Sequence, residues 1–508
     1  SRRRHTRLRT VTGVQTCALP ISLARRGVLS VEVTVSSYSS YVSFLEGYAR
    51  ALAAVESRWD RARDWVLGAI TSTRPEVRYE PEDSGLGRFT VSFPAVTSER
   101  DVNRLANDVF ALPGRLAADK KRQVVVALDE FQAVDAFNGG SVEHALRAAA
   151  RDASGTMAET AAFLRDTYAP VADPRNGVGE DRHALARRRY LGMHVDSDDA
   201  YEWGFAEVQR LDAEIRSCAA EIKPGATLDE VRNFLDNESK EAVEGEENLR
   251  QWLQNLMDEA MEFLISNGHF DIPADIRTIE AKISPPGGAA AQYYMAPSED
   301  LSRPGSTWYP ANGRTRFPLW SEPTTAYHEG VPGHHLQIGM AIVNREKLSR
   351  FQRNEFVSGH GEGWALYAER LMDEFGFLAR PEYRLGFLYA QAFRAARVVV
   401  DIGMHCEKTI PKDWSWHAGE SWTPELALEF LSARSSNDEA FNRSEIDRYL
   451  GWPAQAISYK LGERVWLALR DEARAKHGAN FDLRAWHTYA LDLGNLGLEL
   501  FKSEMARF

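Results

Sequence analysis

The sequence Thr324-Thr-Ala-Tyr-His-Glu-Gly-Val-Pro-Gly-His-His-Leu336 is followed, after a charged interval, by Ser358-Gly-His-Gly-Glu-Gly-Trp-Ala-Leu-Tyr-Ala-Glu-Arg-Leu371. The first stretch contains His328, Glu329 and His334, and the second contains Glu362 within an apolar, helix-forming run. Two histidines and a glutamate form a common ligand set for catalytic zinc, and an adjacent carboxylate can take a proton from water. These two stretches therefore predict one Zn²⁺ site, with Glu329 as the catalytic base.

The spacing of the histidines departs from the usual H-E-x-x-H signature, which places both ligands on one helical face. The fifth position is Pro332, which cannot bind a metal and disrupts a helix. We therefore predict that residues 330–333 form a widened or kinked turn, which brings His334 to the position of the second ligand. In a straight helix His335 would share a face with His328, but about 10 Å away along the axis. His335 is therefore predicted to point elsewhere and to serve as a substrate-binding or supporting group.

These motifs resemble the bacterial domain-of-unknown-function family 885, a zincin-like group, over residues 151–508. They are also more distantly similar to the thimet-oligopeptidase and Taq-carboxypeptidase families. The G-H-x-L half of the thimet-oligopeptidase motif matches residues 333–336, and its third-ligand motif matches Ser358, Glu362 and Trp364. The resemblance implies that His328, His334 and Glu362 hold the zinc ion. Two extra residues in the first motif leave His335 as the alternative second histidine.

Composition indicates a soluble globular chain of more than one domain, since it has 508 residues, 44% hydrophobic and 26% charged. The net charge of −12 argues against nucleic-acid binding, and no apolar run reaches the length of a membrane helix. Three scattered cysteines favour a reducing, cytoplasmic compartment. Residues 1–22 are basic and lack the apolar core of a signal peptide. They resemble translated sequencing-adapter sequence, and we interpret them as a non-native leader.

Residues 23–150 alternate β-branched runs with helical stretches, which predicts a parallel α/β sheet. The predicted strands are 28–36, 89–96 and 123–128, and helical patterns cover 41–70 and 99–118. The run Val-Val-Val-Ala-Leu-Asp-Glu at 124–130 resembles the Walker B element of a P-loop ATPase. Nucleotide binding is nevertheless not expected, because the chain contains no phosphate loop. We interpret this region as a truncated ATPase-like fragment joined to the second domain.

Residues 151–508 are predicted to be helical nearly throughout. Thr227 and Glu230 form a capping box, and helical periodicity covers 241–266, 385–405 and 457–475. A short sheet edge is expected at 291–295, with 306–309 as its hairpin partner. In zincins such an edge pairs with extended substrate, so Tyr293 and Tyr294 are predicted to contact it. An ordinary loop across the helices is the alternative.

Further catalytic groups are sought in the last third of the chain, because a tetrahedral intermediate gains from a donor aimed at its oxyanion. The candidates are His405 and Tyr459, of which Tyr459 is preferred because Ser-Tyr-Lys-Leu-Gly (458–462) resembles the Y-x-L-G of the Taq-carboxypeptidase group. Arg448, with Tyr449 beside it, is a candidate for binding a substrate carboxylate through a bidentate fork. An internal ion pair for the arginine and a buried hydroxyl bonded to a carbonyl for the tyrosine are the alternatives.

The sequence thus predicts a mostly α chain whose second part is a zinc-dependent metallopeptidase acting on short peptides. Two other functions remain open. The same metal site suits a zinc-dependent amidohydrolase acting on a non-peptide amide. A non-catalytic helical protein with a degenerate metal site, marked by Pro332, is the third interpretation.

Overall fold

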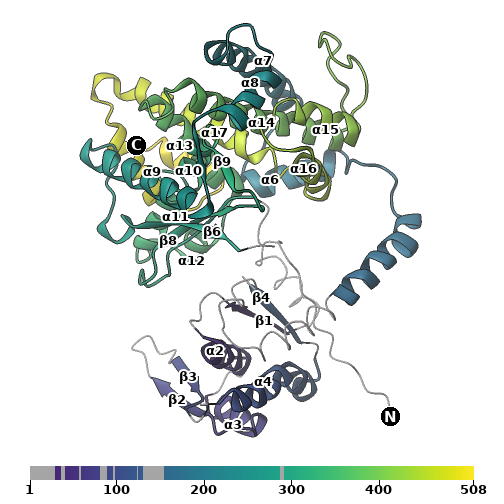
Figure 1. Ribbon diagram of the computed structural model, residues 1–508, viewed down its shortest axis with the longest axis vertical. Helices are drawn as coiled ribbons and strands as arrows, with labels where there is room; N and C mark the ends of the chain where they lie inside the picture. Colours follow the sequence, from purple (N-terminus) through teal and green to yellow (C-terminus); the bar gives the residue numbers. More distant parts are fainter. Residues whose placement is uncertain are drawn as a thin grey trace. The chain divides into compact units, whose positions relative to one another are not determined.

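The computed structural model is mostly helical and divides into two compact units, residues 1–173 and 174–508 (Figure 1). It describes residues 29–35, 40–55, 59–80, 88–94, 96, 98–122, 124–129, 154–285 and 291–508. The predicted leader 1–22, Glu130 of the Walker-B-like run and the predicted boundary at 150/151 lie outside these residues. The two units are described separately.

The first unit contains a parallel pair of strands, β1 (Leu29–Thr34) and β4 (Val124–Asp129), in which Thr34 lies opposite Asp129. Two helices, α2 (Tyr41–Ala53) and α4 (Glu99–Lys120), pack on each other and on these strands. Their shared core includes Phe44 and Tyr48, both almost fully buried. The parallel pairing agrees with the α/β pattern of the sequence.

Two details of the first unit differ from the prediction. The predicted strand 89–96 does not join the parallel pair, because β3 (Arg88–Ser92) pairs antiparallel with β2 (Glu76–Glu80). Strands so close in sequence need only a short connection to pair antiparallel, whereas parallel pairing requires a crossover. The helical pattern 41–70 also forms two helices, α2 and α3 (Trp59–Ala69), rather than one.

The second unit is a helical assembly with small sheets at one side (Figure 1). Its helices are α6 (Glu180–Leu191), α7 (Ser197–Ile222), α8 (Leu228–Asn233), α9 (Glu246–Ser266), α10 (Glu322–Glu329), α11 (His334–Val343), α12 (Arg350–Asn354), α13 (Ser358–Glu374), α14 (Pro381–His405), α15 (Pro424–Ser432), α16 (Glu439–Gly451), α17 (Ser458–His477), α18 (Leu483–Asp492) and α19 (Leu498–Met505). The capping box at Thr227 is present at the start of α8, as predicted. Among the helices that the structure describes, none is long and apolar enough to cross a membrane.

The sheets of the second unit are short. Strand β8 (Gly305–Pro310) lies between β6 (Ile279–Ser284), to which it is parallel, and β7 (Tyr293–Met295), to which it is antiparallel. The predicted pairing of 291–295 with 306–309 is therefore confirmed. A second pair joins β5 (Ala242–Glu244) to β9 (Arg316–Pro318), so the helix expected from residue 241 begins only at Glu246.

Helices α13 and α17 of the second unit pack with their backbones in direct contact. A Cβ atom on Gly363 would lie 2.5 Å from the carbonyl carbon of Gly462, and one on Gly462 would lie 2.0 Å from the carbonyl oxygen of Gly359. No side chain fits at these separations, so Gly363 and Gly462 let the helix backbones touch. The crossing brings Glu362 of α13 and Tyr459 of α17 into the same region.

Candidate metal centre

A four-residue loop separates α10, which ends at Glu329, from α11, which begins at His334. The N–H of Gly333 donates to the carbonyl of Tyr327 at 3.0 Å, and the N–H of His335 donates to that of Gly330 at 3.2 Å. A Cβ atom on Gly333 would lie 1.8 Å from the carbonyl oxygen of His328, so only glycine fits there. The helix is thus interrupted at residues 330–333, as the sequence predicted.

The interruption brings His328, His334 and Glu362 together, and we call these three residues the metal-type cluster. Oε2 of Glu362 lies 3.3 Å from Nε2 of His328 and 3.5 Å from Nε2 of His334. Glu329 also borders the imidazoles, since one ligand atom from each of His328, Glu329 and His334 falls within 4.8 Å of the others. The shorter separations favour Glu362 as the co-ligand and leave Glu329 beside the cluster.

Trp364 fixes the loop to α13. Its indole Nε1–H points to the carbonyl oxygens of Pro332 and Gly333, at 2.9 and 3.0 Å. The indole is fully buried, where a lost hydrogen bond is costly. Because Trp364 follows Glu362 by two residues, the same turn of α13 carries the predicted ligand and positions the loop before His334.

The donor set fits a zinc ion. Two ligands that each lie about 2.0–2.1 Å from one tetrahedral ion are about 3.4 Å apart, close to the separations from Glu362 to both imidazoles. Oε2 of Glu362 is buried and makes no hydrogen bond within the part of the chain described, apart from its ion-pair contacts with the two histidines. Buried polar atoms without partners are rare and require an explanation, which a bound cation provides.

A second carboxylate, Glu369, holds His328 in place. Its Oε1 lies 2.7 Å from Nδ1 of His328, and its Oε2 accepts a hydrogen bond from the hydroxyl of Thr324 at 2.5 Å. Arg394 of α14 lies 3.5 Å from the same carboxylate. Ligating histidines commonly donate their second N–H to a carboxylate, which fixes the ring and increases its basicity.

The sequence analysis missed Glu369, although it lies in the quoted motif. It follows Glu362 by seven residues, or two helical turns, and therefore lies on the same face of α13. That spacing was the available signal. His334 differs from His328 in that its Nδ1 is buried and has no partner among the described residues.

The charges of the cluster follow from burial and close pairing. Burial opposes the charge on His328, but its ion-pair contact with Glu362 and its hydrogen bond to Glu369 outweigh burial and raise the pKa of His328 to about 9. Burial also opposes the charge on Glu362, yet close contacts with both imidazoles hold its pKa well below the usual range. Burial raises the pKa of Glu329, which suits a general base working near neutral pH.

Tyr459 lies beside the cluster, as predicted for an oxyanion donor. Its ring is 6.4 Å from that of His328 and nearly parallel to it. The guanidinium of Arg397 covers the tyrosine ring at 4.7 Å. Burial raises the pKa of Tyr459 to about 12, so its hydroxyl keeps a proton to donate at neutral pH.

His335 points away from the metal-type cluster. Its Nε2–H donates to the carbonyl of Ile276 at 2.8 Å, and its Nδ1 accepts from the hydroxyl of Tyr294 at 2.9 Å. Tyr293 stacks on Trp308 of the neighbouring strand β8. His335 thus ties α11 to the edge strand β7, and the structure gives it contact with Tyr294 rather than with the metal-type cluster.

Arg448 and Tyr449 belong to a second set of residues, which we call the arginine–glutamate cluster: Arg397, Glu445, Arg448 and Tyr449. Arg448 makes a bidentate pair with Glu445 at 2.8 and 2.9 Å. Arg397 donates to Glu445 and to the hydroxyl of Tyr449, at 2.7 and 2.8 Å. The fork of Arg448 is therefore engaged inside the protein, which is the alternative weighed from the sequence.

His405 is fully buried at the end of α14, where its ring stacks on His183 and its Nε2–H donates to the carbonyl of Tyr449. It follows Arg397 by eight residues, or about 12 Å along the helix axis. The structure thus brings together His328, Glu329, His334, Glu362 and Tyr459. It places His405 in a separate buried contact.

Comparison with known proteins gives a family and a fold. The family profile described as "Bacterial protein of unknown function (DUF885)" matches residues 30–505. The match includes most of residues 23–150, and the resemblance of that segment to an ATPase fragment is not confirmed. No curated protein matches the sequence.

Two solved structures are similar to this chain, and each is described as a "putative lipoprotein". The protein from Colwellia psychrerythraea is 24% identical with a TM-score of 0.61, over 82% of this chain and 64% of that one. The protein from Shewanella oneidensis is 16% identical with a TM-score of 0.55, over 81% of this chain and 80% of that one. The chain thus spans less than two thirds of the Colwellia protein. At these identities the similarity shows a shared fold.

Proposed function

The chain belongs to domain-of-unknown-function family 885, and from the chemistry of its metal-type cluster we propose that it is a zinc-dependent metallopeptidase acting on short peptides. One observation carries the proposal: a buried carboxylate oxygen of Glu362 lies between the Nε2 atoms of two buried imidazoles and has no other partner among the described residues. His328, His334 and Glu362 would hold the ion, and zinc supplies Lewis acidity when bound.

Glu329 is proposed as the general base, and burial raises its pKa. It follows His328 directly, and its side chain is partly exposed at the edge of the cluster. In this proposal it accepts a proton from the attacking water and delivers that proton to the leaving amine. Its raised pKa favours both halves of this exchange.

Two other groups assist the same reaction. The protonated hydroxyl of Tyr459 donates to the oxyanion that forms when the amide carbonyl is attacked. Strand β7 pairs with β8 on one side, and its other edge suits an extended peptide, which adds a strand through main-chain hydrogen bonds. Tyr294, bonded to His335, connects that strand to the helix that begins with His334.

The test combines metal analysis with peptide profiling by mass spectrometry. After chelation and reconstitution we expect one zinc per chain and cleavage of short peptides. Glu329→Gln should keep the zinc and lose about 10²–10⁴-fold in rate, the usual contribution of a general base. Glu346→Gln, an exposed glutamate beyond α11, is the matched control and should behave as the native chain. Failure to bind stoichiometric zinc, or native rates in Glu329→Gln, would contradict the proposal. Hydrolysis of non-peptide amides without peptide cleavage would assign the amidohydrolase instead.

A further inference from the structure

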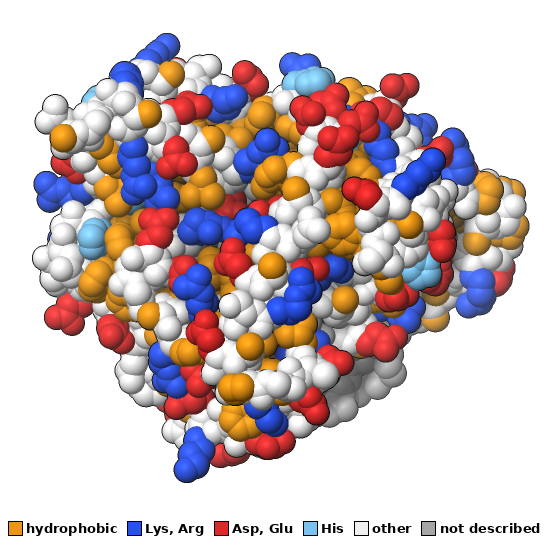
Figure 2. Space-filling view, turned by 90° about the horizontal axis from the view of Figure 1, so that it is seen from above, with side chains coloured by type: hydrophobic (Ala, Val, Ile, Leu, Met, Phe, Trp, Pro, Cys, Tyr) orange, Lys and Arg blue, Asp and Glu red, His pale blue; other side chains and the backbone are white. Residues whose placement is uncertain are grey.

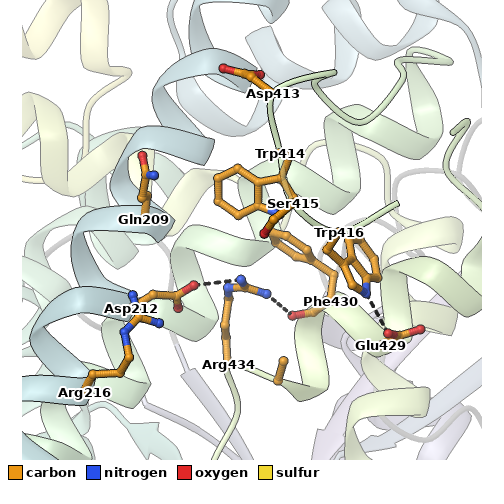
Figure 3. A pocket seen from close by; sticks show the side chains of 11 residues that line it. Gln209, Asp212, Arg216, Asp413, Trp414, Ser415, Trp416, Glu429, Phe430 and Arg434 are labelled. Carbon is orange, nitrogen blue, oxygen red and sulfur yellow. Dashed lines mark hydrogen bonds and ion pairs between the residues drawn. The ribbon is translucent and has the colours of Figure 1, made fainter. Parts of the chain in front are cut away.

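A cavity of about 550 Å³ lies between α7, α15 and the segment 413–416 that precedes α15 (Figure 3). Its volume falls in the range of about 300–1,000 Å³ that is typical of small-molecule sites. None of its lining residues belongs to the metal-type cluster or the arginine–glutamate cluster. The cavity therefore needs a role of its own.

Aromatic rings form one wall of this cavity. Phe430 of α15 is almost fully buried, and the partly exposed rings of Trp416 and Trp414 lie 5.6 and 6.4 Å from it. Phe205 supports Trp414 from behind, edge to face at 4.8 Å. Figure 3 shows the two indoles between the α7 side chain of Gln209 and the α15 side chain of Glu429. A ligand with a flat apolar face can pack against this wall.

The charges of the lining are mixed. Arg434 pairs with Asp212 at 2.8 Å, and Trp416 donates its Nε1–H to Glu429 at 2.7 Å. Arg434 also covers the ring of Phe430 at 4.0 Å, so a ligand cation has no free access to that face. The carboxylates oppose binding of an anion, and the guanidiniums oppose binding of a cation. Figure 2 shows acidic and basic side chains similarly interspersed over one face of the molecule.

Three planar polar groups of the lining remain available. Gln209, Arg216 and Asp413 all line the cavity at exposed positions, where their planar groups can reach a ligand. Together they offer donors and acceptors in flat pairs. Adjacent hydroxyl groups on a ring, each both donor and acceptor, match such pairs.

We propose that this cavity binds a neutral sugar, with the C–H face of a pyranose ring on Trp414 and Trp416 and its hydroxyls on Gln209, Arg216 and Asp413. A pyranose combines an apolar face with a hydroxylated rim and carries no charge. The lining offers an aromatic wall, three exposed planar polar groups, and three carboxylates that are nearly balanced by two guanidiniums. This binding site is separate from the proposed peptidase site and does not depend on it.

The test uses saturation-transfer difference NMR on the full chain with triacetylchitotriose, cellotriose and maltotriose at millimolar concentration. We expect a saturation-transfer signal from at least one trisaccharide. Trp414→Ala should weaken the binding of that sugar by at least about tenfold, which is the loss expected for one stacked ring and its buried area. Gln209→Ala and Asp413→Ala, at exposed positions, should also weaken binding without lowering the melting temperature. Trp252→Ala, on α9 outside the cavity, is the matched control.

The outcomes separate the possible ligands. Tetramethylammonium and methyl phosphate serve as charged probes, and a saturation-transfer signal from either that Trp414→Ala abolishes would overturn the proposal in favour of an ionic ligand. The absence of a saturation-transfer signal from all three trisaccharides would also overturn the proposal. So would sugar binding that persists at native strength in Gln209→Ala, Asp413→Ala and Trp414→Ala.

Discussion

Two buried polar clusters border Tyr459, and they differ in how completely their atoms are paired. In the arginine–glutamate cluster, Glu445 accepts hydrogen bonds from Arg397, Arg448 and Tyr449. In the metal-type cluster, Glu362 presents an oxygen that no group other than the two histidines approaches among the described residues. A network that satisfies itself stabilises a fold, whereas atoms left unpaired around one point mark a place for a ligand.

Helix α14 takes part in both clusters. Arg394 lies 3.5 Å from Glu369 behind His328, and Arg397, one turn later, covers Tyr459 and binds Glu445. Each arginine compensates a buried carboxylate, which would otherwise be costly. The same helix thus carries one arginine behind a predicted ligand and another beside the predicted oxyanion donor.

The largest expected effect concerns the saturated cluster. Glu445→Ala leaves Arg397 buried without its carboxylate and should lower the free energy of unfolding by about 3–5 kcal/mol. Zinc stoichiometry should not change, because Glu445 is not a ligand. Urea unfolding followed by circular dichroism, with metal analysis of the folded fraction, measures both. Loss of zinc from folded Glu445→Ala would remove the distinction between the clusters.

Next in size is the loss of a ligand. Glu362→Gln should weaken zinc binding by more than about 100-fold, beyond the usual cost of altering a residue that only supports a ligand. Competition with a chromophoric chelator gives the affinity. Glu374→Gln, which lies on the same helix and pairs with Arg470, is the control. Equal affinities of the two variants would refute Glu362 as a ligand.

A smaller effect is expected for the supporting carboxylate. Glu369→Gln keeps the size of the side chain but weakens its hold on His328, so zinc affinity should fall by about 10–100-fold. The same chelator competition measures it. A decrease as large as that of Glu362→Gln would show that Glu369 binds the metal itself, and no decrease would show that His328 needs no orientation.

The effect of pH is graded, and over one pH unit it is the smallest of the four. Zinc must displace the proton of His328, whose pKa is about 9 in the metal-free protein, so apparent affinity should fall about tenfold per pH unit below that value. Because the pKa is raised above its unfolded value of 6.5, the pairing stabilises the metal-free fold fully below pH 6.5. That stability is lost as pH rises to 9. Melting temperatures measured with and without chelator should therefore diverge as the pH rises from 6 to 9. A constant difference between them would contradict the pairing of His328 with its carboxylates.

Local patterns predicted much of the second unit. Helical periodicity predicted the bounds of α14 and α17 to within a few residues, and the predicted capping residues of α8 were correct. Pro332 and Gly333 correctly indicated the helix break before His334. Both effects are local, because proline and a crowded backbone each disturb the helix within one turn. Strand β3 was assigned to the wrong partner, since periodicity identifies a strand but not its neighbour.

The sequence by itself indicated His328, His334 and Glu362 as candidate metal ligands, because they lie in two motifs whose residue types suit a metal site. Only the tertiary structure decided which distant groups surround them. The crossing of α13 and α17 at touching glycines brought Tyr459 to the site, and α14 bound Arg448 and Tyr449 into a network with Glu445. Contacts within a few turns follow from backbone geometry, whereas contacts between helices depend on how whole surfaces pack, which no local spacing encodes.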